Sequence, residues 1–91
     1  MNRDFKGIWI PREIWFHPKL TVTDKMLFGL LNTLGESSKK NLIFESKKQL
    51  DIGKNRTTTS YQNLEKENLI EIIRIGLGKE IFLKVRIFNE S

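Results

Sequence analysis

Residues 46–70, SKKQLDIGKNRTTTSYQNLEKENLI, carry the signals that decide the fold. Ser46 and Gln49 have the S-x-x-Q spacing of a capping box, in which the hydroxyl accepts from a backbone amide one turn on and the glutamine bonds back. We therefore expect a helix to begin at Lys47. The segment Asp51-Ile52-Gly53 contains a weak helix former and a glycine, so we expect the helix to end there in a tight turn.

A second helix is predicted from about Lys54 to Glu67. Thr57, Tyr61 and Leu64 follow the i, i+4, i+7 spacing of one helix face, which we expect to point inward. Asn68 is expected to end the helix, because asparagine adopts the left-handed conformation more readily than other non-glycine residues. The opposite face carries polar side chains, namely Lys54, Asn55, Thr58, Thr59 and Gln62. Two short helices joined by a tight turn are the layout of a helix-turn-helix.

The residues before this unit predict a core helix. Thr23 is its expected N-cap, and the charge of Asp24 in the first turn complements the helix dipole. Gly35 is expected to end the helix. The apolar residues between these ends recur at helical spacing: Met26, Leu27, Leu30, Leu31 and Leu34. Residues 36–41 are polar and predict a loop, and residues 42–44 (LIF) predict a short edge strand.

Two strands are predicted after the second helix, at residues 69–75 and 80–88, with residues 76–79 (GLGK) as a hairpin loop. Apolar residues alternate along the second strand, so one face is expected to pack on the helices. Ile72 and Ile73 break the alternation of the first strand and leave its register open. Helix, strand, helix, helix, hairpin is the order of a winged helix domain. We therefore predict an α+β fold in which a three-helix helix-turn-helix core carries a C-terminal β-hairpin wing.

The charge of the chain favours acidic partners. The 91 residues include 16 Lys and Arg against 11 Asp and Glu, which gives a net charge of +5. This length indicates one domain, residues 1–91, in which residues 1–19 form an aromatic-rich N-terminal arm. Residues 46–63 carry four cations against one carboxylate, and residues 1–20 carry four against two. The remainder of the chain is neutral overall.

Several classes of protein are excluded by composition. The chain has no cysteine, so it forms neither disulfides nor thiolate metal sites. No apolar run approaches the roughly 20 residues of a membrane span, and residues 1–4 lack the apolar stretch of a signal peptide, so we expect a cytoplasmic protein. His17, the sole histidine, precedes Pro18 and is expected in a loop. Because no pattern of side chains indicates catalysis, we expect no enzyme, metal, cofactor or small-molecule ligand.

Residues 50–57 (LDIGKNRT) and 64–70 (LEKENLI) resemble the bacterial winged helix-turn-helix pattern, in which a small-residue turn precedes the recognition helix and Leu-x-x-x-Gly-Leu-Ile closes it. Residues 6–15 (KGIWIPREIW) and 20–27 (LTVTDKML) are similar to the start of such domains in phage, plasmid and other mobile-element proteins. Gly53 stands where these domains usually have Ser or Thr, and Asn68 replaces their usual Gly. The resemblance implies double-stranded DNA binding by a small transcriptional regulator or a replication-initiation module.

Carried over position by position, the resemblance implies that one group of side chains faces the major groove: Lys54, Asn55, Thr58, Thr59 and Gln62. It implies that Arg56 reaches guanine or phosphate. Ser46, Lys47 and Lys48 are expected to contact phosphates at a helix N-terminus. Lys79 is expected to contact the DNA backbone from the wing tip. Because Asn and Gln bond adenine and Thr packs against thymine methyl groups, we expect an A·T-rich site.

The N-terminal arm has two interpretations. In the first, residues 8–10 pack as a strand or arm over the first helix, Pro11 ends this stretch, and residues 12–16 make one helical turn. In the second, Trp9, Trp15 and Phe16 form an interface, because exposed aromatic patches mark interaction surfaces. Such an interface fits a homodimer that reads a palindromic site. It also fits an alternative function, a protein-interaction winged helix of a phage or plasmid accessory factor that binds its partner through the arm.

Overall fold

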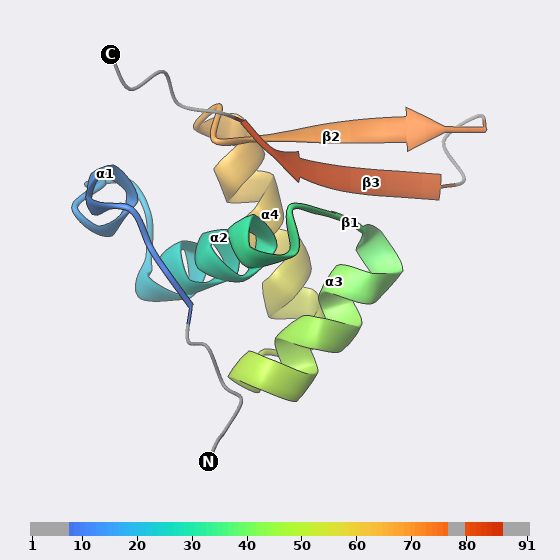
Figure 1. Cartoon of the computed structure of the whole chain (residues 1–91), viewed down its shortest axis with the longest axis horizontal. Helices are drawn as coiled ribbons and strands as arrows, with labels where there is room; N and C mark the ends of the chain where they lie inside the picture. The colour runs from blue at the N-terminus through green and yellow to red at the C-terminus, as the bar shows by residue number, and fades with distance from the viewer. Residues whose placement is uncertain (1–7, 77–79, 87–91) are drawn as a thin grey trace.

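Three main helices and a three-stranded antiparallel sheet make up the computed structural model, which describes residues 8–76 and 80–86 (Figure 1). The main helices are α2 (Val22–Leu34), α3 (Lys39–Glu45) and α4 (Lys54–Lys66). A one-turn helix, α1 (Arg12–Trp15), precedes α2, and a π-helical turn, η1 (Ser46–Leu50), prolongs α3. The strands are β1 (Glu36–Ser38), β2 (Ile70–Ile75) and β3 (Glu80–Val85). The chain is thus a compact α+β domain with a C-terminal hairpin.

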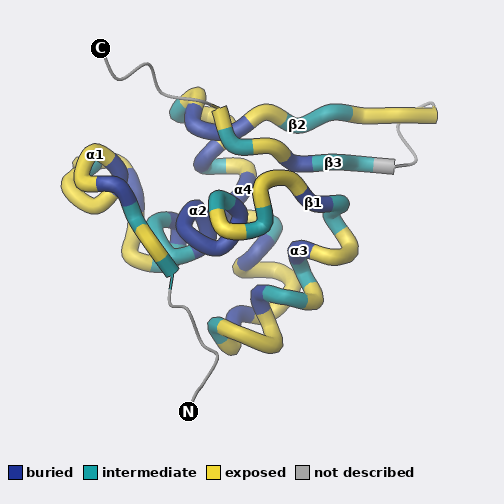
Figure 2. The backbone as a smooth tube through the Cα atoms, in the orientation of Figure 1, coloured by how far each residue is buried: buried dark blue, intermediate teal, exposed yellow. Residues whose placement is uncertain are grey.

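β3 is the central strand of the sheet, with β1 on one side and β2 on the other. Its Leu83 pairs with Ile72 of β2 and Ser37 of β1 and is fully buried, because this face of the sheet packs on the helices (Figure 2). The predicted packing of one strand face is therefore confirmed. Ile73 pairs with Phe82, on the opposite face, where both are half-buried. This pairing gives the register of β2, which the sequence left open at Ile72 and Ile73. The predicted end of the second strand, residues 87 and 88, lies outside the described residues.

α2 is the central helix of the core. Its Leu27, Leu30 and Leu31 are at most 1% exposed, and the predicted apolar stripe is confirmed. Gly35 ends the helix with a φ of 85°, in the left-handed region that favours glycine.

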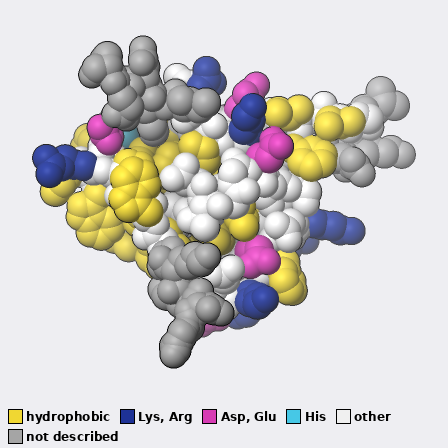
Figure 3. Space-filling view, in the orientation of Figure 1, with side chains coloured by type: hydrophobic (Ala, Val, Ile, Leu, Met, Phe, Trp, Pro, Cys, Tyr) yellow, Lys and Arg dark blue, Asp and Glu magenta, His cyan; other side chains and the backbone are white. Residues whose placement is uncertain are grey.

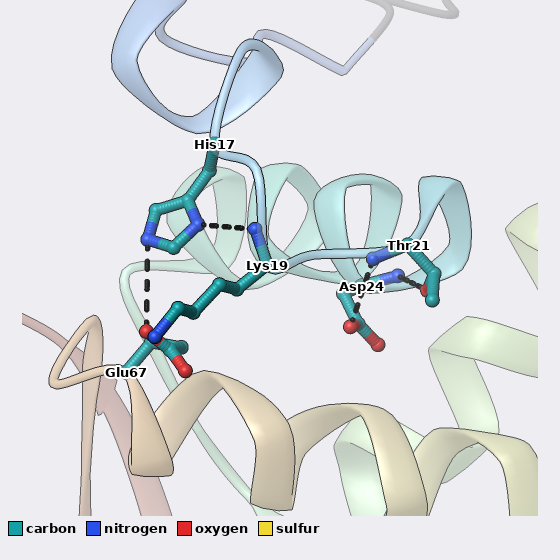
Figure 4. Close-up of polar contacts among 5 residues, drawn as sticks. All are labelled: His17, Lys19, Thr21, Asp24 and Glu67. Atoms are coloured by element: carbon teal, nitrogen blue, oxygen red, sulfur yellow. Dashed lines mark hydrogen bonds and ion pairs between the residues drawn. The ribbon is translucent and has the colours of Figure 1, made fainter.

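The N-cap of α2 is Thr21, and our prediction of Thr23 is wrong. The Thr21 hydroxyl accepts from the Asp24 amide at 3.1 Å, and the Asp24 carboxylate accepts from the Thr21 amide at 3.1 Å (Figure 4). This reciprocal capping box satisfies two amides that a cap at Thr23 would leave without partners. Thr23 lies in the first turn instead, where its hydroxyl is free to accept from another helix.

The region before α4 corrects three predictions. Residues 36–41 are not a loop but contain β1 and the start of α3, and residues 42–44 are helical rather than a strand. The helix begins at Lys39, where the Ser38 hydroxyl accepts from the Asn41 amide at 3.1 Å. Leu42, Ser46 and Leu50 then follow one another at i, i+4 and i+8 and face the interior. Because the helix is already formed at Ser46, the predicted capping box is absent.

The N-terminal arm crosses α2 at Gly29. A Cβ atom at Gly29 would lie 2.9 Å from Cγ1 of Ile10 and in still closer contact with Cγ2 of Ile8, so glycine makes room for the arm. Residues 8–10 belong to no helix or strand, and α1 follows directly after Pro11. Ile14 of α1 is fully buried. The first interpretation of the arm, packing over the first long helix, is therefore confirmed for the described residues.

Candidate nucleic-acid interface

α4 presents two faces of different character. The inner face packs against α2 and the core and consists of four buried residues, Thr57, Ser60, Tyr61 and Leu64. The helix begins after Gly53, in extended conformation, and ends before Asn68, whose φ of 63° is left-handed. These observations confirm the predicted inner face and the predicted role of Asn68.

The outer face of α4 is exposed and polar. Four exposed residues recur at i, i+4, i+7 and i+11 and define the outer stripe of α4, namely Asn55, Thr59, Gln62 and Lys66. Three of them were predicted from the sequence. Lys66 was missed, although its position four residues after Gln62 was a signal that it continues the stripe. The structure therefore supplies a cation at the C-terminal end of this surface.

Cations outnumber carboxylates along α4. Lys54 and Arg56 are exposed in its first turn, Lys66 in its last, and Glu65 is its one carboxylate. Thr58 is half-buried at the side of the helix rather than on the outer stripe. The outer surface is thus positive and rich in side chains that both donate and accept hydrogen bonds.

Arg56 is held by the start of α2. Its guanidinium donates to the Thr23 hydroxyl at 2.9 Å, and nearby Asn63 donates to the Asp24 carboxylate at 3.4 Å. These contacts lie at a cleft of about 340 Å³ between the two helices, which Asn55 and Thr59 of the outer stripe also line. Arg56 therefore lies to one side of the outer stripe, with its remaining donors exposed. This position suits a phosphate contact better than the guanine contact that the resemblance also allowed.

η1 holds two of the predicted cations, Lys47 and Lys48. Lys47 donates to the Asp51 carboxylate at 2.9 Å, and this hydrogen bond, with the charge of Lys47, lowers the pKa of Asp51. The ammonium of Lys48 lies 5.8 Å from the centre of the Phe44 ring. Both lysines are exposed, whereas Ser46 is fully buried. Ser46 therefore does not reach a ligand at the surface, because its helix begins at Lys39.

The three aromatic residues predicted as an interface lie over α1 and the arm. Lys79 falls outside the described residues. Trp9, Trp15 and Phe16 are 67%, 47% and 71% exposed, and hydrophobic side chains gather over α1 and the arm on the face drawn in Figure 3. The ammonium of Lys25 lies 5.6 Å from the centre of the Trp15 ring. α1 and α3 lie on opposite sides of α2 (Figure 1).

His17 joins α1 to the end of α4. Its Nδ1 accepts from the Lys19 amide at 3.2 Å, so its Nε2 carries the hydrogen in the neutral ring, and Nε2 lies 3.9 Å from the Glu67 carboxylate (Figure 4). This is the predicted loop position. Among the described residues no group of three His, Asp or Glu side chains is placed to hold a metal ion.

Comparison of the chain with known protein families, with curated proteins and with solved structures found no match. The helices within residues 8–76 and 80–86 are all too short or too polar to cross a membrane. The candidate interface therefore rests on its own geometry and charge.

Proposed function

We propose that the chain is a winged helix-turn-helix domain that binds double-stranded DNA, with α4 as the recognition helix. The observation that carries the proposal is the outer stripe of α4, an exposed polar line that ends in a lysine and contains no carboxylate. With 13 residues, α4 is about 20 Å long. A helix of this size fits the major groove of B-DNA, which is about 12 Å wide.

The topology supports the same proposal. The order helix, strand, helix, helix, hairpin and the sheet order β1-β3-β2 place the hairpin beside α4, where a wing would flank the DNA. The side chains support a division of labour. Asn55 and Gln62 offer bidentate contacts to adenine, and Thr59 offers a methyl group for thymine. The cations that neutralise phosphates are Lys48, Lys54, Arg56 and Lys66.

The proposal is tested by fluorescence anisotropy with an A·T-rich duplex over a series of salt concentrations. We expect affinity to fall steeply with salt, because each neutralised phosphate releases counterions. The double variant Lys54→Ala and Arg56→Ala should bind at least about tenfold more weakly, since charge-assisted contacts are worth about 1–3 kcal/mol each. The absence of binding at low salt would refute the proposal.

A matched control separates a specific surface from general positive charge. Lys39→Ala with Lys40→Ala removes the same charge from the start of α3, which is not part of the outer stripe, and should leave affinity within about twofold. An equal loss in both double variants would show that net charge, rather than α4, attracts the duplex. Circular dichroism of each variant checks that the fold is retained.

The biological role that we propose is that of a small transcriptional regulator or replication-initiation module of a phage, plasmid or other mobile element. Selection of bound sites from a random duplex library tests it further. A recovered motif with dyad symmetry would indicate a homodimer on the DNA, because the half-sites of paired recognition helices lie about one helical turn apart. An asymmetric motif would indicate one domain per site.

A further inference from the structure

A groove of about 670 Å³ lies between the N-terminal arm, the end of α2 and β3. Its apolar wall includes Trp9, Phe28 and Val85, and exposed cations frame it, namely Arg12, Lys84 and Arg86. No residue of α4 or η1 lines it. An occupant of the groove would therefore leave the outer stripe of α4 accessible.

The charge of the groove rests on Arg12 and Arg86, because Lys84 stands directly opposite Glu36 of β1 and Glu71 of β2 in the sheet. None of the three forms an ion pair with another described residue, and Glu13 is the one carboxylate in the lining. The amide of Arg86 donates to the carbonyl of Leu69 at 3.1 Å, which fixes the backbone of this residue directly after β3. An occupant with carboxylates would match this charge.

The chemistry of the lining favours a peptide over a nucleic acid. Gly35 in the lining marks the C-terminal end of α2, where the last carbonyl groups of a helix lack intrahelical donors and carry partial negative charge. A peptide offers backbone N–H donors for these carbonyls together with carboxylates for the cations. Single-stranded nucleic acid is bound on successive stacking rings, whereas Trp9 is the one exposed ring in the lining.

We infer that this groove binds an acidic peptide segment of a partner protein, which places one apolar side chain against Trp9 and Val85 and its carboxylates near Arg12 and Arg86. A volume of this size is in the range of ligand pockets, about 300–1,000 Å³, and takes a few side chains rather than a folded domain. The inference does not depend on DNA binding by α4.

The test is selection of binders from a phage-displayed library of random 12-residue peptides against the full chain. We expect enriched peptides to combine Asp or Glu with an aromatic or aliphatic residue. Their binding, measured by fluorescence polarisation, should weaken at least about tenfold in the double variant Arg12→Glu and Arg86→Glu, since at least one charge-assisted contact is lost and a second repels. The double variant Lys39→Glu and Lys40→Glu, with the same change of charge, should bind within about twofold of wild type.

Each other outcome would overturn the inference. Enrichment of neutral or basic peptides, or no enrichment above an unrelated protein, would show that the groove has no preference for acidic segments. Equal loss in both variants would show that binding follows net charge. A dimer in sedimentation velocity that dissociates in the Arg12→Glu and Arg86→Glu variant would assign the groove to a second copy of the chain.

Discussion

Replacing Gly29 by alanine tests the contact between the N-terminal arm and α2. Gly29 is buried within α2, and the added Cβ would lie 2.9 Å from Cγ1 of Ile10, 3.3 Å from the carbonyl oxygen of Trp9, and closer still to Cγ2 of Ile8. Two of these atoms belong to β-branched side chains and the third to the backbone. Because none is the end of a flexible side chain, the arm must shift to admit the methyl group.

Two opposing effects set the magnitude. Alanine is about 1 kcal/mol better than glycine in a helix interior. Overpacking a filled site costs about 1–3 kcal/mol, and three close contacts favour the upper half of this range. We therefore expect Gly29→Ala to lower the free energy of unfolding by about 1–2 kcal/mol and Tm by about 5–15 °C.

Urea denaturation, followed by circular dichroism, measures the change. A double-mutant cycle with Ile8→Ala identifies its cause, since removal of the Ile8 side chain should reduce the cost of the added methyl group by at least about 0.5 kcal/mol. A Gly29→Ala protein more stable than wild type would refute the reasoning, because only helix propensity would then be acting.

Three further changes have expected outcomes. The hydroxyl of Thr57 is buried without a hydrogen-bond partner, so Thr57→Val should raise the free energy of unfolding, measured by urea denaturation, by up to about 1 kcal/mol. A lower free energy of unfolding in the variant would show that the hydroxyl does have a partner. By NMR, Asp51 should have a pKa below its ordinary value of 3.8, and Lys47→Ala should raise the pKa of Asp51 toward that value. The exposed pair of Lys47 and Asp51 stabilises the fold at pH values above the ordinary pKa. This stabilisation disappears as the pH falls through the lowered pKa of Asp51. Asn68→Ala should destabilise the fold by about 1 kcal/mol in thermal unfolding and Asn68→Gly should not, because residue 68 has a left-handed backbone conformation. Equal destabilisation by both variants would show that the left-handed conformation is not the cause.

The sequence predicted α4 well because its signals are local. The apolar period from Thr57 to Leu64, the glycine before the helix and the asparagine after it agree on one interpretation. The hairpin was predicted for the same reason, since alternation and paired glycines act over a few residues.

The helix before α4 was predicted wrongly because two serines offer equivalent local caps. Ser38 and Ser46 both precede a polar residue at the third helical position, and the choice depends on contacts distant in sequence. β1 pairs with β3, and Leu42 fills the core, and both contacts need the helix to begin at Lys39. Tertiary packing thus overrides the capping signal.

The candidate interface was predicted in part for related reasons. Helical period alone placed Asn55, Thr59 and Gln62 on one exposed line. The hydrogen bond from Arg56 to Thr23 joins residues 33 positions apart, and no local sequence pattern predicts it. The burial of Ser46 likewise follows from where its helix begins.

The most direct test of DNA binding by α4 is an NMR titration of isotope-labelled protein with an A·T-rich duplex. The side-chain amide signals of Asn55 and Gln62 report on the outer stripe, and the indole signal of Trp9 reports on the arm. We expect the two amide signals to shift and saturate while the indole signal stays unchanged. Unchanged amide signals, or shifts confined to the indole, would contradict the proposal that α4 enters the groove of DNA.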